Sequence, residues 1–227
     1  MDVEITKELV EKIDKILSFG LSCGLGIPIP GEMCVEAAIC YSLGLNHGDD
    51  PKCVNKFLRA IKIDLNDAIW SSKEARAKGL RNLAILQLGT KENFDEKLFL
   101  EKLAMFTCTD FLPYFLSNEN YEWFTDGWKD ALTNSKSFET AIDTARVVAN
   151  NAGVCSCVDA FHTAADAADA AYYATSLHCA YEVASSNLAY SVARAATRVS
   201  DDLYLNYFAK GMENILIEMN VPAKDFI

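Results

Sequence analysis

The chain has few of the features that mark disorder, secretion or a membrane span. Only five of its 227 residues are proline and no long polar tract occurs, so we expect a folded globular protein. The N-terminus has no basic start followed by an apolar run, and no uncharged apolar stretch reaches about 18 residues. We therefore expect neither a secretory signal nor a membrane span, and we predict a cytoplasmic protein.

Strand-like alternation of apolar and polar residues is almost absent as well. Apolar residues instead recur with the 3.6-residue period of an α-helix. We predict an all-α fold, a multi-helix bundle of about eight to ten helices with little or no strand. We predict a motif-rich N-terminal part, residues 1–91, and an Ala-rich C-terminal helical part, residues 92–227. The two parts are expected to pack as one compact unit.

Capping residues and glycines suggest where several helices begin and end. The first helix is expected at about residues 4–18 and the last at about 201–219. A second helix should follow Gly31 and close at Gly44. Asp50-Pro51 is typical of a helix start, with Asp50 as the N-cap. Ser71 and Glu74 have the spacing of a capping box, which predicts a fourth helix running to Leu88 and ended by Gly89.

The eight cysteines resemble a disulfide framework in number only. The chain is long, has no predicted secretory signal and places most of its cysteines inside apolar runs. We predict buried free thiols of a reducing compartment.

Residues 51–81, which we call the basic segment, differ in charge from the rest of the chain. They contain eight basic and three acidic residues, a net charge of +5, whereas the whole chain carries −11. A local excess of one sign indicates a local cause, such as an anionic ligand. The overall negative charge argues against nucleic-acid binding, which needs a broad basic face.

Residues 18–89 contain two motif-bearing segments, GLGIPIPGEMCVEAAICYSLGLNHGDDPKCV and KIDLNDAIWSSKEARAKGLRNLAILQLG. This pattern resembles a family of uncharacterised bacterial and phage-encoded helical proteins. The resemblance implies no catalytic residues, because no activity is established for that family. The C-terminal part, rich in alanine and tyrosine, looks like immunity-type helical proteins, which implies neutralisation of a partner or ligand.

The basic segment also holds the parts of an anion site. Guanidinium groups, a helix N-terminus with a serine hydroxyl and an aromatic ring suit a phosphate-bearing ligand with a stacked base. Arg76, Arg81 and Lys62 would hold the phosphates and Trp70 would stack. The predicted ligand-binding residues are Glu36, His47, Asp50, Lys62, Asn66, Asp67, Trp70, Ser72, Arg76 and Arg81. The alternative is a solvated basic helix face with Trp70 in the core.

Each polar position near this segment also has a structural interpretation. Glu36 lies in an apolar helix and would form an ion pair with an arginine of the basic segment. Asn66 and Asp67 favour a turn. Our leading hypothesis is a non-catalytic protein that sequesters a nucleotide-like signalling ligand in a bacterial or phage conflict, as an anti-defence protein would. We expect no cofactor and no metal.

A second hypothesis is a cysteine-dependent hydrolase. Cys34 is expected at a helix start, where the partial positive charge lowers the pKa of a thiol. His47 and Asp50 would complete a Cys-His-acid arrangement. The structural alternative is an inert Cys34 in the core, with Asp50 as a helix cap.

A third hypothesis is an inhibitor or immunity-type protein that binds a protein partner. Asp159, His162, Asp166 and Asp169 have the spacing of one helical face. This acidic face would contact the partner, although a solvated face or an inward metal-binding stripe would share the spacing. The Ala-rich helices also favour a homo-oligomer.

Overall fold

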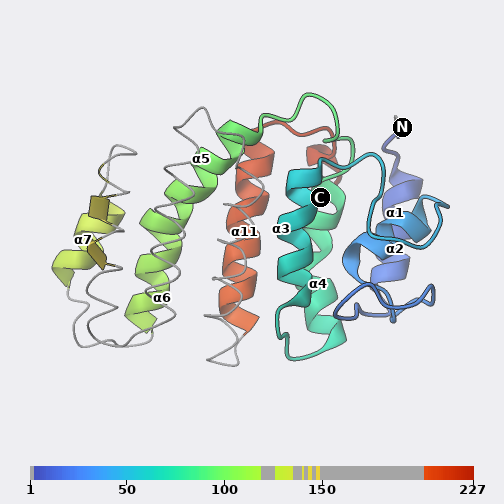
Figure 1. The fold of residues 1–227 in the computed structure, drawn as a ribbon, viewed down its shortest axis with the longest axis horizontal. Coiled ribbons are helices and arrows are strands. Elements are labelled where there is room, and N and C mark those ends of the chain that lie inside the picture. Colours follow the sequence, from blue (N-terminus) through green and yellow to red (C-terminus); the bar gives the residue numbers. More distant parts are fainter. Residues whose placement is uncertain (1–2, 119–125, 135–139, 141–142, 145–146, 149–201) are drawn as a thin grey trace. The chain divides into compact units, whose positions relative to one another are not determined.

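The computed structural model describes residues 3–118, 126–134, 140, 143–144, 147–148 and 202–227. Within these ranges the chain consists of helices and connecting loops, without a strand, and the all-α prediction is confirmed for them (Figure 1). No helix in the described ranges combines the length and the apolar character needed to cross a bilayer. The predicted Ala-rich helices and the acidic face at residues 159–169 lie outside the described residues.

The chain divides into two compact units. The first unit comprises residues 1–95 and 196–227, and the second comprises residues 96–195. The first unit therefore draws on both of the parts distinguished in the sequence.

In the first unit, α4 is the central helix. Its elements are α1 (Lys7–Leu17), α2 (Val35–Ser42), α3 (Lys56–Asp67), α4 (Lys73–Leu86), α11 (Asp202–Glu218) and the 3-10 helix η2 (Lys224–Phe226). α4 contacts all the others, and α11 lies alongside it although the two are far apart in sequence (Figure 1). Leu80, Leu83 and Leu86 of α4 are fully buried, so this helix supplies the middle of the apolar core.

Glycines end two of these helices, as the sequence predicts. Gly44 follows α2 with φ +70° and Gly89 follows α4 with φ +74°. Both lie in the left-handed region, which glycine enters without a steric penalty.

The predicted start of the third helix at Asp50-Pro51 is wrong. α3 begins at Lys56, and its N-cap is Asn55, whose side chain accepts a hydrogen bond from the Phe57 N–H at 2.8 Å. The Asp50 carboxylate instead forms ion pairs with Arg59, at 2.9 Å, and with Lys52. A cap and an ion pair compete for the same carboxylate oxygens, and here the ion pairs prevail.

Two further predictions from local sequence, the Ser71 cap and the turn at Asn66 and Asp67, are wrong. The N-cap of α4 is Ser72, whose hydroxyl accepts from the Ala75 N–H at 3.0 Å, and not Ser71. Ser71 is engaged by Asp202 of α11, whose carboxylate accepts its N–H at 2.8 Å. Asn66 and Asp67 form no turn, because they are the last two residues of α3.

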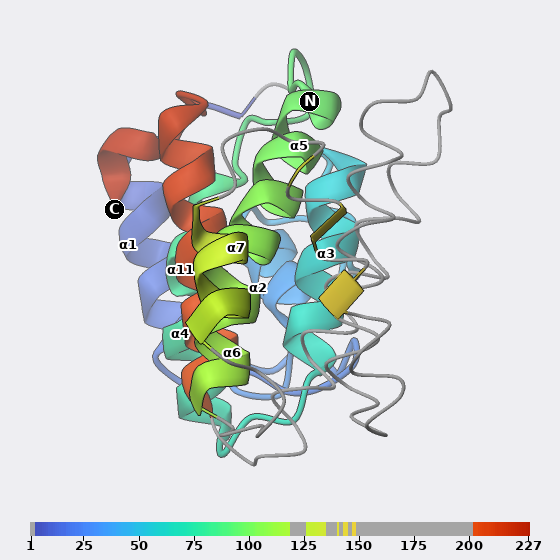
Figure 2. The same ribbon diagram turned by 90° about the vertical axis from the view of Figure 1, so that its left-hand side faces the viewer.

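In the second unit a π-helical turn precedes Pro113. The described elements of this unit are α5 (Glu96–Phe106), the π-helix η1 (Thr107–Phe111), α6 (Leu112–Asn118) and α7 (Asp126–Thr133) (Figure 2). Pro113 is the second residue of α6 and has no N–H for the carbonyl of Thr109, so the wider turn falls where a hydrogen bond is missing. The rings of Phe111 and Phe115 stack in this unit, with centroids 6.3 Å apart.

Candidate functional site

A buried ion pair occupies the centre of the first unit. Glu36 of α2 and Lys62 of α3 are 0% and 1% exposed, and Lys62 Nζ lies 3.0 Å from Glu36 Oε1. Gln87, just after α4, donates from Nε2 to Glu36 Oε2 at 3.1 Å. Three successive helices are thus joined through one carboxylate. The predicted ion pair of Glu36 exists, with a lysine and not an arginine of the basic segment as its partner.

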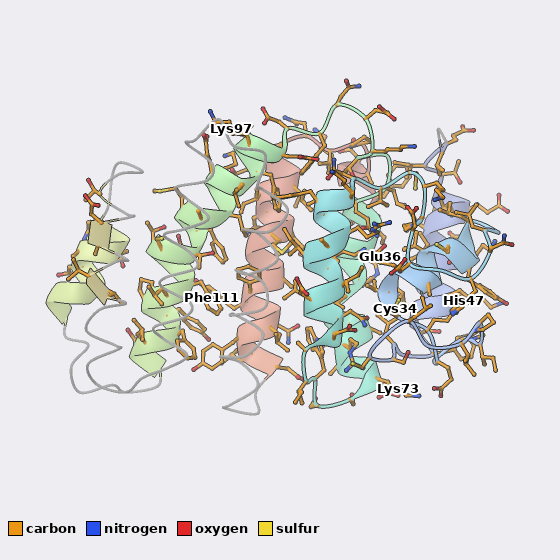
Figure 3. The ribbon with its side chains drawn as sticks, in the orientation of Figure 1. Cys34, Glu36, His47, Lys73, Lys97 and Phe111 are labelled. Atoms are coloured by element: carbon orange, nitrogen blue, oxygen red, sulfur yellow. The ribbon has the colours of Figure 1, made fainter. Side chains whose placement is uncertain are left out.

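Burial favours the neutral form of both side chains in this pair. Desolvation raises the pKa of Glu36 and lowers the pKa of Lys62, while their mutual attraction opposes both shifts. Neither side chain is accessible to a ligand, so both serve the core. Figure 3 labels Glu36 among the side chains of the first unit.

Trp70 and Arg76 are also turned into the protein. Trp70 is 6% exposed, and its indole N–H donates to the Leu65 carbonyl at 2.9 Å. Arg76 is 8% exposed and donates to the carbonyls of Leu21, at 2.9 Å, and Ala68, at 3.3 Å. Cη2 and Cζ3 of the indole lie against Gly79 of α4, and the buried side chain offers no stacking platform to a ligand.

Asn66 and Asp67 anchor the loop before α2. Asn66 is buried; its Oδ1 accepts from the Val35 N–H, the first of α2, at 3.1 Å, and its Nδ2 donates to the Ser22 carbonyl at 3.0 Å. Asp67 Oδ1 accepts from the Gly24 N–H at 2.8 Å. Ser72 is used as the cap of α4. These polar residues complete backbone hydrogen bonds that would otherwise be unsatisfied.

The basic segment finds most of its counter-charges in the first fifty residues. Residues 1–50 contain nine acidic and three basic residues, a net charge of −6. Ion pairs cross between the two segments at Lys62–Glu36, Lys73–Glu32, Arg81–Asp14, Lys52–Asp50 and Arg59–Asp50. The charge excess that drew attention to the basic segment is therefore largely balanced within the unit.

The cysteine, histidine and aspartate of the hydrolase hypothesis have other partners. Cys34 is the N-cap of α2, 5% exposed, and its Sγ accepts from the Ala37 N–H at 3.4 Å. Burial raises its pKa, and this outweighs the lowering by the backbone N–H groups of α2. His47 contacts the Gly26 carbonyl through Nε2 at 3.1 Å, and Asp50 pairs with Arg59. Among the described residues no hydrogen bond links these three side chains to one another.

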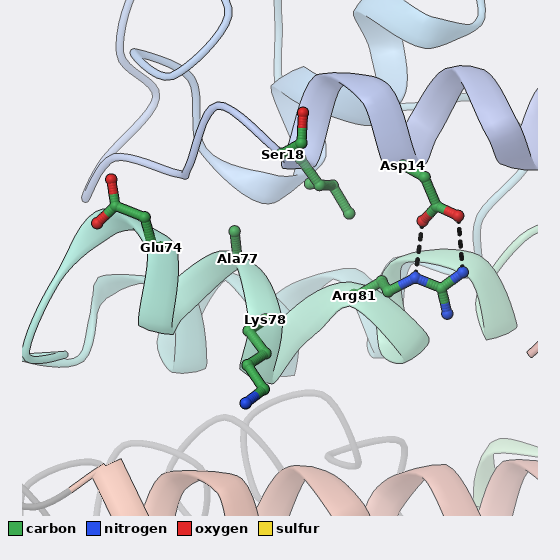
Figure 4. A pocket seen from close by; sticks show the side chains of 7 residues that line it. Asp14, Ser18, Glu74, Ala77, Lys78 and Arg81 are labelled. Carbon is green, nitrogen blue, oxygen red and sulfur yellow. Dashed lines mark hydrogen bonds and ion pairs between the residues drawn. The ribbon is translucent and has the colours of Figure 1, made fainter.

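The described residues of the first unit line hollows that include a groove and a smaller notch. A groove of about 290 Å³ lies between α1 and α4 and is lined by Asp14, Leu17, Ser18, Glu74, Ala77, Lys78 and Arg81. Figure 4 shows Glu74 at one end of this groove, the Asp14–Arg81 pair at the other and Ala77 between them. A smaller notch of about 140 Å³ is lined by Gly24, Leu25, Cys34, Val35, Asp49, Ile63, Asn66 and Asp67.

The predicted ligand residues are thus distributed over different places. Arg81 lines the groove, Asn66 and Asp67 line the notch, and Glu36, Lys62, Trp70 and Arg76 lie in the core. Comparison with protein families, with curated proteins and with solved structures found no match to this chain. The geometry of these hollows must therefore carry the functional argument.

Sequence reasoning missed the part of the groove that α1 supplies. Asp14 of α1 and Ser18, the C-cap of that helix, are four residues apart, and Lys78 and Arg81 are three apart on α4. The acidic excess of residues 1–50 was the signal that could have paired Asp14 with the basic segment.

The described cysteines differ in how readily they should react with thiol reagents. At neutral pH we expect iodoacetamide to modify Cys23 first and to leave Cys34 unmodified until the protein is denatured. Cys23 is exposed, whereas Cys34 is buried with a raised pKa, and burial raises the pKa of Cys40 to about 12. Time-resolved tandem mass spectrometry measures each site. Modification of Cys34 as fast as Cys23 would restore the nucleophile hypothesis.

Proposed function

We propose that the first unit is a non-catalytic binding module that holds a small phosphate-bearing ligand in the groove between α1 and α4. The observation that carries this proposal is an arginine, Arg81, that lines the groove together with the apolar side chains of Leu17 and Ala77. Figure 4 shows Arg81 and Ala77 on α4, with Arg81 held by Asp14 of α1. In a bacterial or phage setting, such a module would sequester a nucleotide-like signalling molecule.

Arg81 is positioned for an anion by its neighbours. Asp14 accepts from Nε and from Nη2, both at 2.7 Å, and Asn82 Oδ1 accepts from Nη1 at 2.8 Å. These contacts occupy three of the five N–H donors of the guanidinium, leaving one on each Nη atom. These remaining donors can bind phosphate oxygens, and the contacts with Asp14 and Asn82 set the position of the guanidinium before the ligand arrives.

The groove also limits the size and chemistry of the ligand. A volume of about 290 Å³ lies just below the range for small-molecule pockets, roughly 300–1,000 Å³. A ligand no larger than a mononucleotide would suit it. Glu74 and Ser18 offer acceptors to hydroxyl or amino groups, and the ammonium of Lys78 is turned away from α1 in Figure 4. No aromatic residue lines the groove, so we do not propose base stacking there.

Removing Arg81 tests the proposal. Calorimetric titration of the full chain with mononucleotides, sugar phosphates and inorganic phosphate should identify a ligand for the unsubstituted protein. Arg81→Ala should then weaken its binding by about tenfold to a hundredfold, the usual value of a charge-assisted hydrogen bond. Asp14→Asn should strengthen binding, because it removes a negative charge that repels phosphate and, since an amide has a single acceptor oxygen, frees one of the two Arg81 donors that Asp14 holds.

Arg59→Ala is the matched control. Arg59 is also an arginine of the basic segment paired with one aspartate, but it lies outside the groove. It should change affinity by no more than about twofold, as surface substitutions away from a site do. Equal losses in the two arginine variants, or no binding of any phosphate compound by the unsubstituted protein, would contradict the proposal.

A further inference from the structure

A loop of the first unit holds four large apolar side chains in solvent. Phe19, Leu25, Ile27 and Ile29 are between 45% and 54% exposed, and we call residues 19–31 the apolar loop. Single exposed apolar residues are ordinary on a protein surface, but several on one short segment mark an interaction site.

Backbone hydrogen bonds hold the apolar loop in place. The N–H groups of Ser22 and Ile27 donate to the carbonyls of Met33 and Glu32, both at 2.9 Å. Gly26 has φ +69°, and a Cβ at this position would lie 1.9 Å from the Glu32 carbonyl oxygen, so the crossing requires glycine. The apolar side chains are therefore presented on an ordered backbone, which lowers the entropic cost of binding a partner.

The notch described above adjoins the apolar loop and shares residues with it. Leu25 and Gly24 of the loop line the notch together with Asp49 and Asp67, and no lysine or arginine is among its lining residues. Both aspartates are exposed, and Asp49 has no ion pair within the described part of the chain. A hollow with carboxylates and an apolar rim complements a cationic side chain whose neighbours are apolar.

We propose that the apolar loop and the notch together form a docking surface for a protein partner that presents a lysine or arginine between large apolar side chains. The cationic group would enter the notch between Asp49 and Asp67, and its neighbours would cover Leu25, Ile27 and Ile29. Arginine and large apolar or aromatic side chains are typical anchors at the centre of an interface. A lipid surface fits less well, because anionic headgroups repel a chain of net charge −11 and the carboxylates of the notch. This surface is independent of the groove between α1 and α4.

Selection from a random peptide display library on the full chain tests this proposal. The enriched peptides should share a lysine or arginine flanked by leucine, isoleucine or aromatic residues. Fluorescence anisotropy with the best synthetic peptide should show affinity losses of about tenfold or more for Asp49→Asn and for Ile27→Ser. Far-UV circular dichroism confirms that each variant keeps its helices.

Matched controls lie elsewhere in the same unit. Glu8→Gln removes an exposed carboxylate from α1, and Leu203→Ser removes an apolar side chain, 46% exposed, from α11. Both should bind the peptide within about twofold of the unsubstituted protein. The proposal is overturned if the enriched peptides lack a basic residue, or if Asp49→Asn binds them unchanged. It is also overturned if Ile27→Ser abolishes self-association or sedimentation with vesicles instead of peptide binding.

Discussion

Glu36→Gln is expected to lower the free energy of unfolding of the first unit by about 3–5 kcal/mol, the usual cost of leaving a buried charge without its partner. Lys62 is 1% exposed, and within the described part of the chain its Nζ has no hydrogen bond of normal geometry. The Glu36 carboxylate, 3.0 Å from Nζ, is the negative charge that compensates the buried ammonium group. Glutamine keeps the shape and the contact with Gln87 but removes the negative charge.

Urea unfolding followed by the fluorescence of Trp70 measures this effect in the unit concerned. Trp70 belongs to the first unit, so the other two tryptophans, Trp123 and Trp128, would be replaced by phenylalanine in all variants. A two-state fit of the same slope in each variant licenses comparison of the free energies.

A double variant separates loss of the charge pair from loss of shape. Glu36→Leu with Lys62→Met replaces both charges with apolar side chains, and it should recover most of the stability lost in Glu36→Gln. A buried ion pair rarely contributes more than a well-packed apolar pair of similar volume. A double variant as unstable as Glu36→Gln alone would show that packing around these positions, and not the unpaired charge, causes the loss.

The stability deficit of Glu36→Gln should shrink as the pH rises from 7 towards 10. Burial lowers the pKa of Lys62 below its ordinary value of 10.5, and removal of the opposing carboxylate lowers that pKa further. The unfolded chain then binds more protons than the folded one, so stability increases with pH until the unfolded lysine also loses its proton. Urea midpoints at several pH values test this; a deficit that is independent of pH would exclude a charged Lys62 as its cause.

Gly79→Ala is expected to lower the free energy of unfolding by about 2–3 kcal/mol, as overpacking of a core does. In the middle of an ordinary helix the same change would stabilise by up to about 1 kcal/mol. The sign reverses here because a Cβ on Gly79 would lie 2.4 Å from Trp70 Cη2 and 2.8 Å from Asn206 Oδ1 of α11. The indole cannot move away easily, since its N–H is bonded to Leu65 and the ring is buried.

Combining Gly79→Ala with Trp70→Phe tests the cause of this effect. Phenylalanine has no atoms equivalent to Cη2 and Cζ3 of tryptophan, which are the atoms that the new methyl group would meet. The Gly79→Ala substitution should therefore be tolerated in the Trp70→Phe protein. Thermal and urea unfolding of the four proteins gives a double-mutant cycle with a favourable coupling of about 1–3 kcal/mol. Additive effects of the two substitutions would mean that Trp70 is not what opposes the methyl group.

Local signals predicted much of the first unit because they act over a few residues. Periodicity and capping signals placed helices at α1, α4 and α11, and Gly44 and Gly89 follow helices as expected. The helix starts were less predictable wherever two polar residues competed for the role. Asn55 and Ser72 are the caps, while Asp50 and Ser71 are drawn into contacts with Arg59 and Asp202. Ser71 is taken up by a contact with a residue 131 positions away, which no local pattern contains.

The sequence by itself determined that this chain is helical, and it also showed that residues 51–81 carry an excess of positive charge. Only the tertiary structure decided where that charge goes. It pairs Lys62 with Glu36 inside the core, buries Trp70 over Gly79 and leaves Arg81 in an open groove. The reason is that helix formation depends on neighbours along the chain, whereas the burial and pairing of a side chain depend on which helices meet.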